Sequence, residues 1–278
     1  MPRNFTELLR AKWDEGKFVC VGLDAVYKKI PEHLKANRSF EDAIFEFNKV
    51  IVTATQTLVC AYKPNTAFYE AYGDEGLRVL KRTCDFIREV APTVPVILDA
   101  KRGDIGDTNL GYVSYGYEWL AHADAMTVHP YLGEEALRPF LDMKDKGVIV
   151  LCKTSNKGSD EFQDLKVDGI PLYQIVAKNV STMWNKNGNC LLVAGATYPE
   201  ELGEIRKIVG DLPLLIPGIG KQGGDVEKVV MYGHDSKKQG MVINSSSGII
   251  FASSGTDFEK VARIETQKLH DLITSYNK

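Results

Sequence analysis

The residues best suited to chemistry lie in one short segment, V-I-L-D-A-K-R-G-D, where an apolar run ends in Asp99, Lys101 and Asp104. Side chains two positions apart on a β-strand point to the same side. We therefore expect Asp99 and Lys101 to project together and Asp104 to lie just beyond, on the following loop. Neighbouring carboxylates favour the charged form of a lysine, so Lys101 would be a cation and proton donor. Schiff-base chemistry, which needs a neutral amine, is disfavoured.

A structural network of ion pairs is the alternative interpretation of this cluster. Asp24 closes another apolar run and Lys63 closes a third, so five ionisable side chains are predicted to converge at one end of the fold. Removing each charge from water is costly, and packing of a core does not require them. The convergence favours a functional site.

A glycine-rich turn follows a further apolar run, in the segment L-L-I-P-G-I-G-K-Q-G-G-D from 214 to 225. A helix is predicted to begin near Gly224 and Asp225. Backbone amides in such a turn, together with the positive end of a helix dipole, can bind phosphate. The Gly218–Gly220 turn is weak evidence by itself, but it follows the seventh predicted strand, where barrels commonly bind phosphate.

The remaining reactive side chains show no recognisable pattern. The five histidines lack H-x-x-H and H-E-x-x-H spacing, and a structural hydrogen bond explains His129 equally well. The five cysteines contain no C-x-x-C pair and are expected to be reduced core residues. The stretch N-S-S-S-G at 244–248 is no nucleophile elbow. We predict no metal, no cofactor and no serine nucleophile.

The elements that must position these residues are short apolar runs alternating with longer stretches of helical spacing. We count eight such runs, at residues 18–24, 58–64, 95–101, 124–130, 147–154, 190–196, 213–219 and 240–246. Nearly continuous apolar strands indicate a parallel sheet covered by helices. Eight βα units favour an α/β fold of the TIM (β/α)8 barrel type, with a parallel eight-stranded sheet and outer helices, over an open sheet. The last helix is expected to be capped by Asp257.

Two long polar interruptions, 25–39 and 155–170, follow predicted strands. Barrels build their active sites from the loops at that end of the strands, so both are predicted substrate loops. Because no linker rich in Pro, Gly or Ser divides the chain, we expect one domain over residues 1–278.

Composition excludes several classes of protein. The chain is 44% hydrophobic and 26% charged, which is typical of a globular protein, and its net charge is −3. That charge provides no global field for nucleic acid or an anionic membrane, so any phosphate must be bound locally. No apolar run approaches the roughly 20 residues of a membrane span, and the N-terminal segment lacks a signal-peptide core. We expect a cytoplasmic location and neither a nucleic-acid nor a membrane partner.

The ordered motifs of the chain resemble those of the orotidine 5′-phosphate decarboxylase family, in particular its longer branch. The most specific is the D-x-K-x-x-D array at 99–104, followed by Ile105 and Thr108. The segments G-L-D, K-P-N-x-A-F-x-E, P-Y-L-G, T-S-N-x-G-S and P-G-I-G-x-Q-G-G-D agree in order along almost the whole chain.

The resemblance implies decarboxylation of orotidine 5′-monophosphate to UMP and CO2, the last step of de novo pyrimidine nucleotide synthesis, without a cofactor. Lys63, Asp99, Lys101 and Asp104 would form a chain of alternating charge, with Asp104 supplied by the partner subunit of a homodimer. Lys101 would protonate C6 of the pyrimidine while Asp99 lies near the substrate carboxylate. The implied substrate contacts are Asp24 and Lys63 at the ribose, Ser155 at the pyrimidine, Ile105 and Thr108 across the interface, and Pro217, Gly218, Gly220, Gln222 and position 247 at the phosphate.

One position departs from the family pattern. Relatives typically carry Arg in an N-S-S-R-G segment, where this chain has Ser247. A hydrogen bond to a charged group contributes roughly 1.5 to 3 kcal/mol. We therefore predict weaker substrate binding unless another cation substitutes, and Lys221 is the nearest candidate in sequence.

Two other functions compete with this interpretation. A magnesium-dependent keto-acid sugar phosphate decarboxylase can share the D-x-K-x-x-D array on the same barrel. A non-catalytic phosphosugar-binding barrel would explain the absent Arg, although Lys63, Asp99, Lys101 and Asp104 are all present.

Overall fold

The computed structural model describes residues 3–120, 122–220 and 225–278. Its centre is a sheet of eight parallel strands, which correspond to the eight predicted runs. The strands are β1 (Val19–Gly22), β2 (Val59–Lys63), β3 (Ile97–Arg102), β4 (Ala125–Val128), β5 (Gly147–Lys153), β8 (Cys190–Ala194), β9 (Leu214–Pro217) and β10 (Met241–Ser245).

The sheet closes on itself. Seven neighbouring pairs follow the order β2-β1-β10-β9-β8-β5-β4-β3, and parallel bridges Tyr62 to Val96 and Asn65 to Asp99 join the two ends. Nearly every strand residue is buried, because the strands pack on helices outside and on one another's side chains inside. The predicted (β/α)8 barrel is confirmed.

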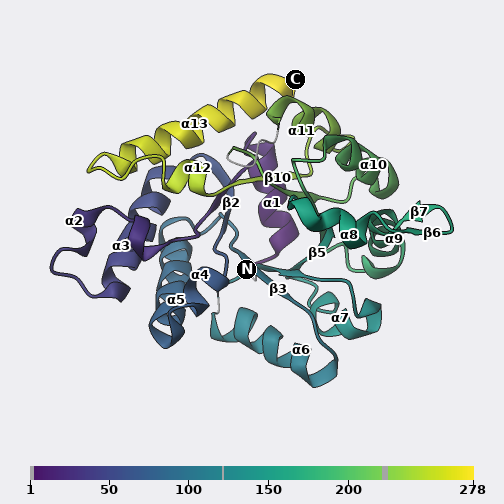
Figure 1. Cartoon of the computed structure of the whole chain (residues 1–278), viewed down its shortest axis with the longest axis horizontal. Helices are drawn as coiled ribbons and strands as arrows, with labels where there is room; N and C mark the ends of the chain where they lie inside the picture. The colour runs from purple at the N-terminus through teal and green to yellow at the C-terminus, as the bar shows by residue number, and fades with distance from the viewer. Residues whose placement is uncertain (1–2, 121, 221–224) are drawn as a thin grey trace.

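Helices surround the strands (Figure 1). The outer layer contains α3 (Phe40–Thr55), α5 (Gly73–Val90), α6 (Gly106–Val113), α7 (Gly133–Leu141), α9 (Leu172–Asn179), α10 (Pro199–Val209), α11 (Val226–Gly233) and α13 (Phe258–Tyr276). Two of them continue into π-helical turns, Ser114–Trp119 after α6 and Val180–Trp184 after α9. Asp225 caps α11 by accepting from two backbone amides, as its sequence position predicts.

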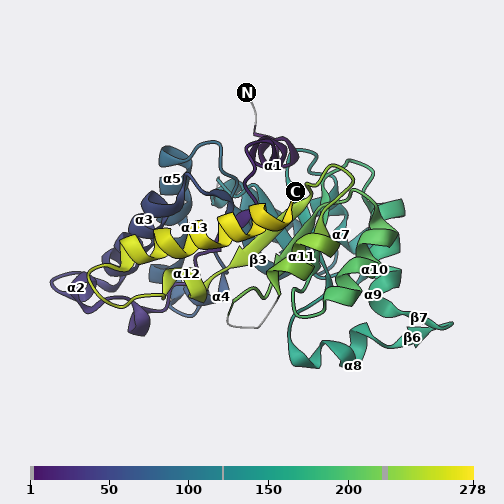
Figure 2. The same ribbon diagram turned by 90° about the horizontal axis from the view of Figure 1, so that it is seen from above.

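Helix α1 (Phe5–Asp14) covers the end of the barrel where the strands begin (Figure 2). Its Trp13 donates a hydrogen bond from Nε1 to the carbonyl oxygen of Met241 over 2.8 Å. The ring of Phe5 packs so closely on Gly147 that a Cβ there would lie 2.2 Å from it. Helix α1 therefore closes the end of the barrel where the strands begin, and a binding site can form only at the opposite end.

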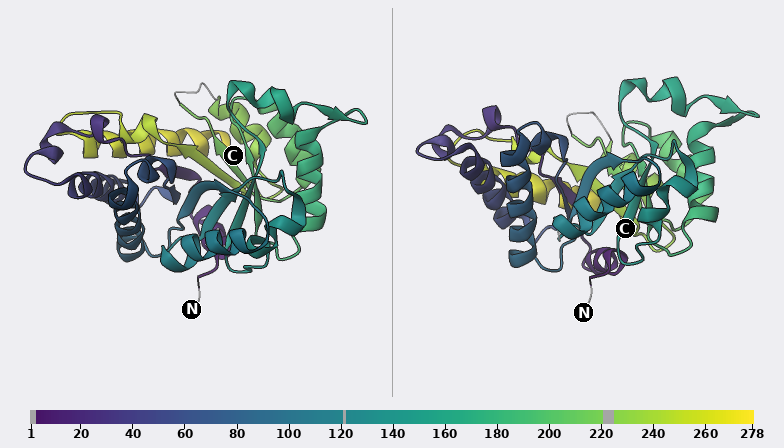
Figure 3. Two further views of the ribbon diagram at one scale, coloured as in Figure 1. Left: turned by 60° about the horizontal axis from the view of Figure 1, so that its bottom comes forward. Right: turned by 90° about the horizontal axis from the view of Figure 1, so that it is seen from below.

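The opposite end carries short elements within the two predicted substrate loops and beside them. They are the 3₁₀ turns η1 (Tyr27–Lys29) and η3 (Lys157–Ser159), helices α2 (Glu32–Lys35), α4 (Ala67–Glu70), α8 (Asp160–Gln163) and α12 (Ser247–Ile250), and strands β6 (Lys166–Val167) and β7 (Ile170–Pro171). The β6–β7 hairpin projects from the body (Figure 3). The interruption at 155–170 is thus more structured than its polar composition suggests.

Three expectations about individual residues can be compared with the structure. Asp257 precedes α13, but its carboxylate accepts from the Ser253 hydroxyl over 2.6 Å and makes no capping bond, so the predicted cap is wrong. All five cysteines are free and buried, as expected. Within the described ranges, no helix is long and apolar enough to cross a membrane.

Candidate active site

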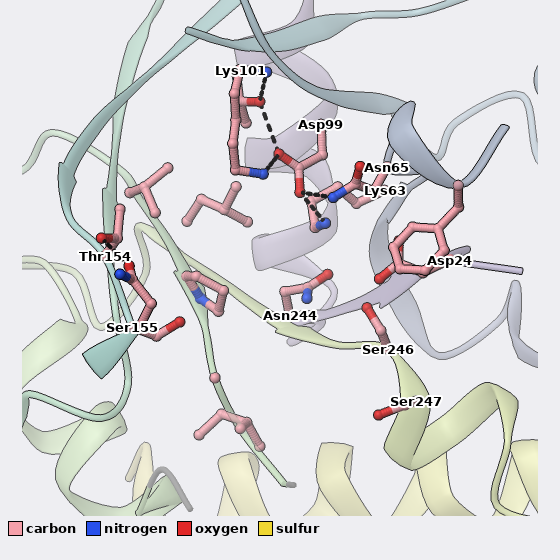
Figure 4. A pocket seen from close by; sticks show the side chains of 18 of the residues that line it. Asp24, Lys63, Asn65, Asp99, Lys101, Thr154, Ser155, Asn244, Ser246 and Ser247 are labelled. Carbon is pink, nitrogen blue, oxygen red and sulfur yellow. Dashed lines mark hydrogen bonds and ion pairs between the residues drawn. The ribbon is translucent and has the colours of Figure 1, made fainter. Parts of the chain in front are cut away.

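A pocket of about 620 Å³ opens at the carboxyl ends of the strands. It is lined from the barrel side by residues that end or follow a strand, including Asp24, Lys63, Asp99, Lys101 and Asn244. Residues of both predicted substrate loops complete its wall. Parallel strands bring their carboxyl ends to one mouth, which is why residues distant in sequence meet there (Figure 4).

Asp99 is the centre of the charged cluster. Its Oδ2 accepts from Lys63 Nζ over 2.7 Å and from Asn65 Nδ2 over 3.3 Å. Its Oδ1 accepts from Lys101 Nζ over 2.6 Å and from the Thr127 hydroxyl over 2.9 Å. Both carboxylate oxygens are therefore held by two donors each, which fixes the orientation of the group.

These contacts determine the charge states. Burial alone would raise the pKa of the Asp99 carboxyl, but the charges and hydrogen bonds of Lys63 and Lys101 outweigh it and hold that pKa well below its ordinary value. Burial would likewise lower the pKa of Lys63, yet the negative charges of Asp99 and Asp24 raise it above its ordinary value. The pair Asp99 and Lys63 is thus ionised at neutral pH.

Lys101 reaches this cluster through an irregular strand end. Its φ is +48°, in the left-handed region that a non-glycine residue rarely adopts. The register between β3 and β4 shifts between Leu98 and Arg102, and the Lys101 amide donates to the Thr127 hydroxyl over 3.0 Å. Such strain concentrates at functional sites. The side chains of Asp99 and Lys101 do point into the same pocket, as predicted. They do so because of the bulge at Lys101, and not because side chains alternate regularly along the strand.

Two buried oxygen atoms in the pocket wall are hydrogen-bond acceptors without a donor among the described residues. Asp24 Oδ1 and Asn244 Oδ1 have no hydrogen-bond partner among the described residues. Leaving a buried polar atom unpaired costs about 1 to 3 kcal/mol. Both side chains line the pocket, so a ligand with hydroxyl or amide donors would satisfy them.

Ser155 lies on the opposite wall (Figure 4), where a close backbone contact positions it. A Cβ at Gly195 would lie 2.8 Å from the Ser155 backbone, so only glycine allows this approach. The loop that follows is anchored by two further contacts. Buried Lys153 donates to Asp164 over 2.6 Å, and Gln163 Oε1 accepts from the Thr154 amide over 2.9 Å.

The third region of the pocket is the predicted phosphate end. Pro217, Gly218 and Ser247 line it as the sequence predicts, whereas Gly220 does not. Gln222 and Lys221 lie outside the described residues. Ser247 lies across the pocket from Lys101 (Figure 4).

Three predicted residues are not brought to this pocket by the single chain. Asp104, Ile105 and Thr108 follow β3 but do not line it. The Asp104 carboxylate accepts from the amide of Ile105 over 2.7 Å, and the Ile105 side chain is 60% exposed. Of the five ionisable residues expected to converge, four do.

Several pocket residues were not singled out by sequence reasoning. Thr127 looks like an ordinary apolar-strand residue, so its role could not be read from type or spacing. Asn65 lies in the K-P-N motif, and Asn244 and Ser246 lie at the end of an apolar run, where polar side chains indicate a barrel mouth. Lys29 lies in a predicted substrate loop.

The histidine that follows β4 makes a structural contact. His129 lies within hydrogen-bond distance of the Gly103 carbonyl oxygen, with its Nε2 2.9 Å away, as a structural histidine would. Within residues 3–120, 122–220 and 225–278, no three His, Cys, Asp or Glu side chains form a group that could hold a metal ion.

The fold and the site define the class: an α/β-barrel enzyme whose charged mouth surrounds an ionised aspartate held between two lysines. Residues 17–260 match the model of the orotidine 5′-phosphate decarboxylase / HUMPS family, and the chain belongs to that family. It is 45% identical over 271 residues to an orotidine 5′-phosphate decarboxylase of Cellvibrio japonicus (strain Ueda107), covering 97% of this chain and 98% of that one.

Solved structures show the same relationship. The Leishmania donovani OMP decarboxylase superposes with a TM-score of 0.81 at 36% identity, covering 96% of this chain and 99% of that one. The Leishmania donovani UMP synthase superposes with a TM-score of 0.88 at 37% identity. It covers 99% of this chain, which spans 57% of the length of that protein.

Proposed function

We propose that this chain decarboxylates orotidine 5′-monophosphate to UMP and CO2, as a carboxy-lyase of pyrimidine nucleotide synthesis. The observation that carries the proposal is the Lys63–Asp99–Lys101 cluster, in which one buried carboxylate is fixed between two ammonium groups at the pocket floor. The comparisons with named decarboxylases along nearly the whole chain support it.

The reaction needs a proton donor beside a developing carbanion. The bond between C6 and the substrate carboxylate breaks, its electron pair remains on C6, and CO2 leaves. Lys101 Nζ then gives a proton to C6 and regains one from solvent. Charge placed in advance stabilises the carbanion without reorganisation, which is the largest contribution in many enzymes. Asp99 keeps Lys101 in place and lies where the substrate carboxylate would bind.

Substrate contacts follow from the pocket wall. The unpaired Oδ1 of Asp24 would accept a hydrogen bond from a ribose hydroxyl, and Lys63 would donate one to the ribose. Ser155 would contact the pyrimidine from the opposite wall. Pro217, Gly218 and Ser247 border the phosphate end, and we extend the phosphate site to Gly220 and Gln222. Binding energy from this remote end would help to position the reacting end.

We further propose a homodimer with a shared active site. The segment after β3 exposes large apolar side chains, with Ile105 60% and Leu110 51% exposed, and Tyr131 of the next loop is 82% exposed. Exposed apolar surface beside an active site is typical of an interface. A partner covering it would bring its own Asp104, Ile105 and Thr108 toward the pocket.

The remaining proposals concern the whole chain. We infer that residues 1–278 act as one domain, because a single cluster of buried hydrophobic residues runs through the barrel. A cytoplasmic location is supported by five free, buried cysteines, since reducing compartments keep thiols unpaired.

The reaction is tested by the ultraviolet absorbance of orotidine 5′-monophosphate, followed with purified protein and excess EDTA. Loss of substrate absorbance that survives chelation is expected. Activity that EDTA abolishes and Mg²⁺ restores would instead support a magnesium-dependent decarboxylase. UMP binding without turnover would support a binding-only barrel.

The shared site is tested by mixing two inactive variants, Lys101→Ala and Asp104→Ala, and allowing subunits to exchange. In a mixed dimer one site combines an intact Lys101 with the partner's intact Asp104, so about a quarter of the wild-type activity should return. A mixture as inactive as its components would contradict a shared site.

A further inference from the structure

Three lysines of the described part of the chain line the pocket, and two of them already form ion pairs. Lys63 and Lys101 both bind Asp99 at the reacting end. The third is Lys29, at the end of the 3₁₀ turn η1 that follows β1. Its side chain makes no ion pair with any described carboxylate. The third lysine is thus available to an anionic ligand.

Lys29 is placed at the phosphate end through an aromatic ring. Its Nζ lies 5.6 Å from the ring centroid of Phe251, at a distance typical of a cation–π contact. The amide of Phe251 donates to the carbonyl oxygen of Ser247 over 3.3 Å, so this ring lies one turn beyond Ser247. Buried Phe47 stacks on the Phe251 ring, with the ring centroids 5.7 Å apart, and so helps to hold that ring in place. The ammonium is therefore held near the turn that contains Ser247.

A phosphate in this pocket needs a cation at that place. The loops after the seventh and eighth barrel strands are where such barrels bind phosphate. Their described pocket-lining residues include Gly218, Ser246 and Ser247, and none of the described lining residues of these two loops is charged. The chain has a net charge of −3, so no general field compensates for a phosphate dianion. Lys221 lies outside the described residues, so within the described part of the chain a local positive charge has to come from a neighbouring segment.

We infer that Lys29 supplies this charge and binds the 5′-phosphate of the substrate, taking the role that Ser247 cannot fill. The inference rests on the proposed function, whose substrate carries that phosphate. Lys29 belongs to a different loop from Ser247, so the cation reaches the phosphate from the β1 side of the mouth. Its flexible stem lets the ammonium move from the Phe251 ring to the ligand.

The experiment compares Lys29→Gln with Lys28→Gln, a matched control. Lys28 is the preceding residue of the same turn, is also exposed and is not among the residues that line the pocket. The dissociation constants of UMP and uridine are measured by calorimetry for each protein. Lys29→Gln should weaken UMP binding roughly tenfold or more and leave uridine binding unchanged, since a contact to a charged group is lost. Lys28→Gln should change neither constant.

Two further variants complete the design. Adding Ser247→Arg to Lys29→Gln should restore UMP binding, because the new guanidinium supplies the missing charge at the neighbouring position. Lys221→Gln should have a smaller effect than Lys29→Gln. The inference is overturned if Lys29→Gln matches Lys28→Gln, if it weakens uridine as much as UMP, or if Lys221→Gln alone removes the preference for the phosphate.

The result also separates this inference from the proposed reaction. UMP binding that depends on Lys29, without turnover of orotidine 5′-monophosphate by the unsubstituted protein, would overturn the reaction and retain the phosphate site. Failure of the unsubstituted protein to bind UMP would overturn both.

Discussion

The two ends of the pocket are built differently. At the reacting end, Lys63 and Asp99 are buried residues of β2 and β3, and four donors hold the Asp99 carboxylate. At the predicted phosphate end, the lining groups include Pro217 at the end of β9, Gly218 of the following loop, Ser247 at the start of α12 and the exposed Lys29 of the turn η1. One end is fixed by the barrel, and the other is assembled from separate segments.

The difference between the two ends determines which charged residues of the pocket can be substituted. Asp99 lies on a strand and accepts from four donors, so it cannot be replaced alone without leaving a buried charge of the cluster unpaired. A cation that binds phosphate can come from any nearby loop, since charge attraction tolerates more variation in geometry. The loss of a cation, as in Ser247 where relatives have Arg, can therefore be compensated at the phosphate end of the pocket but not at the reacting end.

The largest effect is expected for Asp99→Asn at the reacting end. The amide keeps the shape but removes the charge that orients Lys101, so kcat should fall by about a hundredfold to a thousandfold. The assay is turnover of orotidine 5′-monophosphate at saturating substrate. Asp124→Asn, which alters a buried aspartate that pairs with Arg3 and does not line the pocket, serves as control. A kcat within a few-fold of wild type would show that the cluster is structural.

The same substitution should reduce stability in a manner that depends on pH. Breaking a buried pair costs about 3 kcal/mol or more, because Lys63 loses its counter-charge. The pKa of Asp99 is lowered in the folded protein, so its contribution is fully present above the unfolded value of about 3.9 and is lost as pH falls toward the folded value. Urea unfolding of both proteins should therefore differ from pH 5 to 8 and converge in strong acid. A difference that grows on acidification would refute this.

A smaller loss is expected for Thr127→Val, which keeps the shape of the side chain. The hydroxyl both donates to Asp99 and accepts from the Lys101 amide. Removing it should lower kcat about tenfold and leave UMP affinity nearly unchanged. Equal losses in kcat and UMP affinity would place Thr127 in substrate binding instead.

The smallest effect is expected for Ser247→Arg in the otherwise unchanged chain. With Lys29 already near the phosphate end, a second cation should lower KM only by about threefold to tenfold. The initial rate at low substrate provides the measurement. An unchanged kcat/KM would contradict the idea that charge limits binding at this end.

The fold could be predicted from the sequence because its pattern is simple. Eight buried parallel strands require eight apolar runs, and both ends of each predicted run lie within two residues of the ends of an observed strand. The hydrogen-bond partners of individual polar side chains were less predictable. Asp257 precedes α13 as expected, but its carboxylate accepts a hydrogen bond from the Ser253 hydroxyl and not from a backbone amide of the helix. No rule of sequence spacing predicts which of these two donors the carboxylate binds.

The site could be predicted only in part. Asp24, Lys63, Asp99 and Lys101 end apolar runs, and charge at that place is unusual enough to be noticed. The contribution of Thr127 could not be predicted from the sequence. Its hydroxyl accepts from the Lys101 amide only because the register between β3 and β4 shifts at the bulge, and that shift depends on how the two strands pair. Lys29 could not be assigned either, since its position depends on a contact with Phe251, more than two hundred residues later.

The most direct test compares Lys101→Ala and Lys101→Arg with the wild-type protein. Arginine keeps the positive charge but cannot give up a proton in a protein. Both kcat for orotidine 5′-monophosphate and the dissociation constant of UMP are measured. If Lys101 delivers the proton to C6, both variants should lose about a thousandfold in kcat, while UMP affinity changes by less than about tenfold. A kcat for either variant within about tenfold of wild type would show that another group protonates the product.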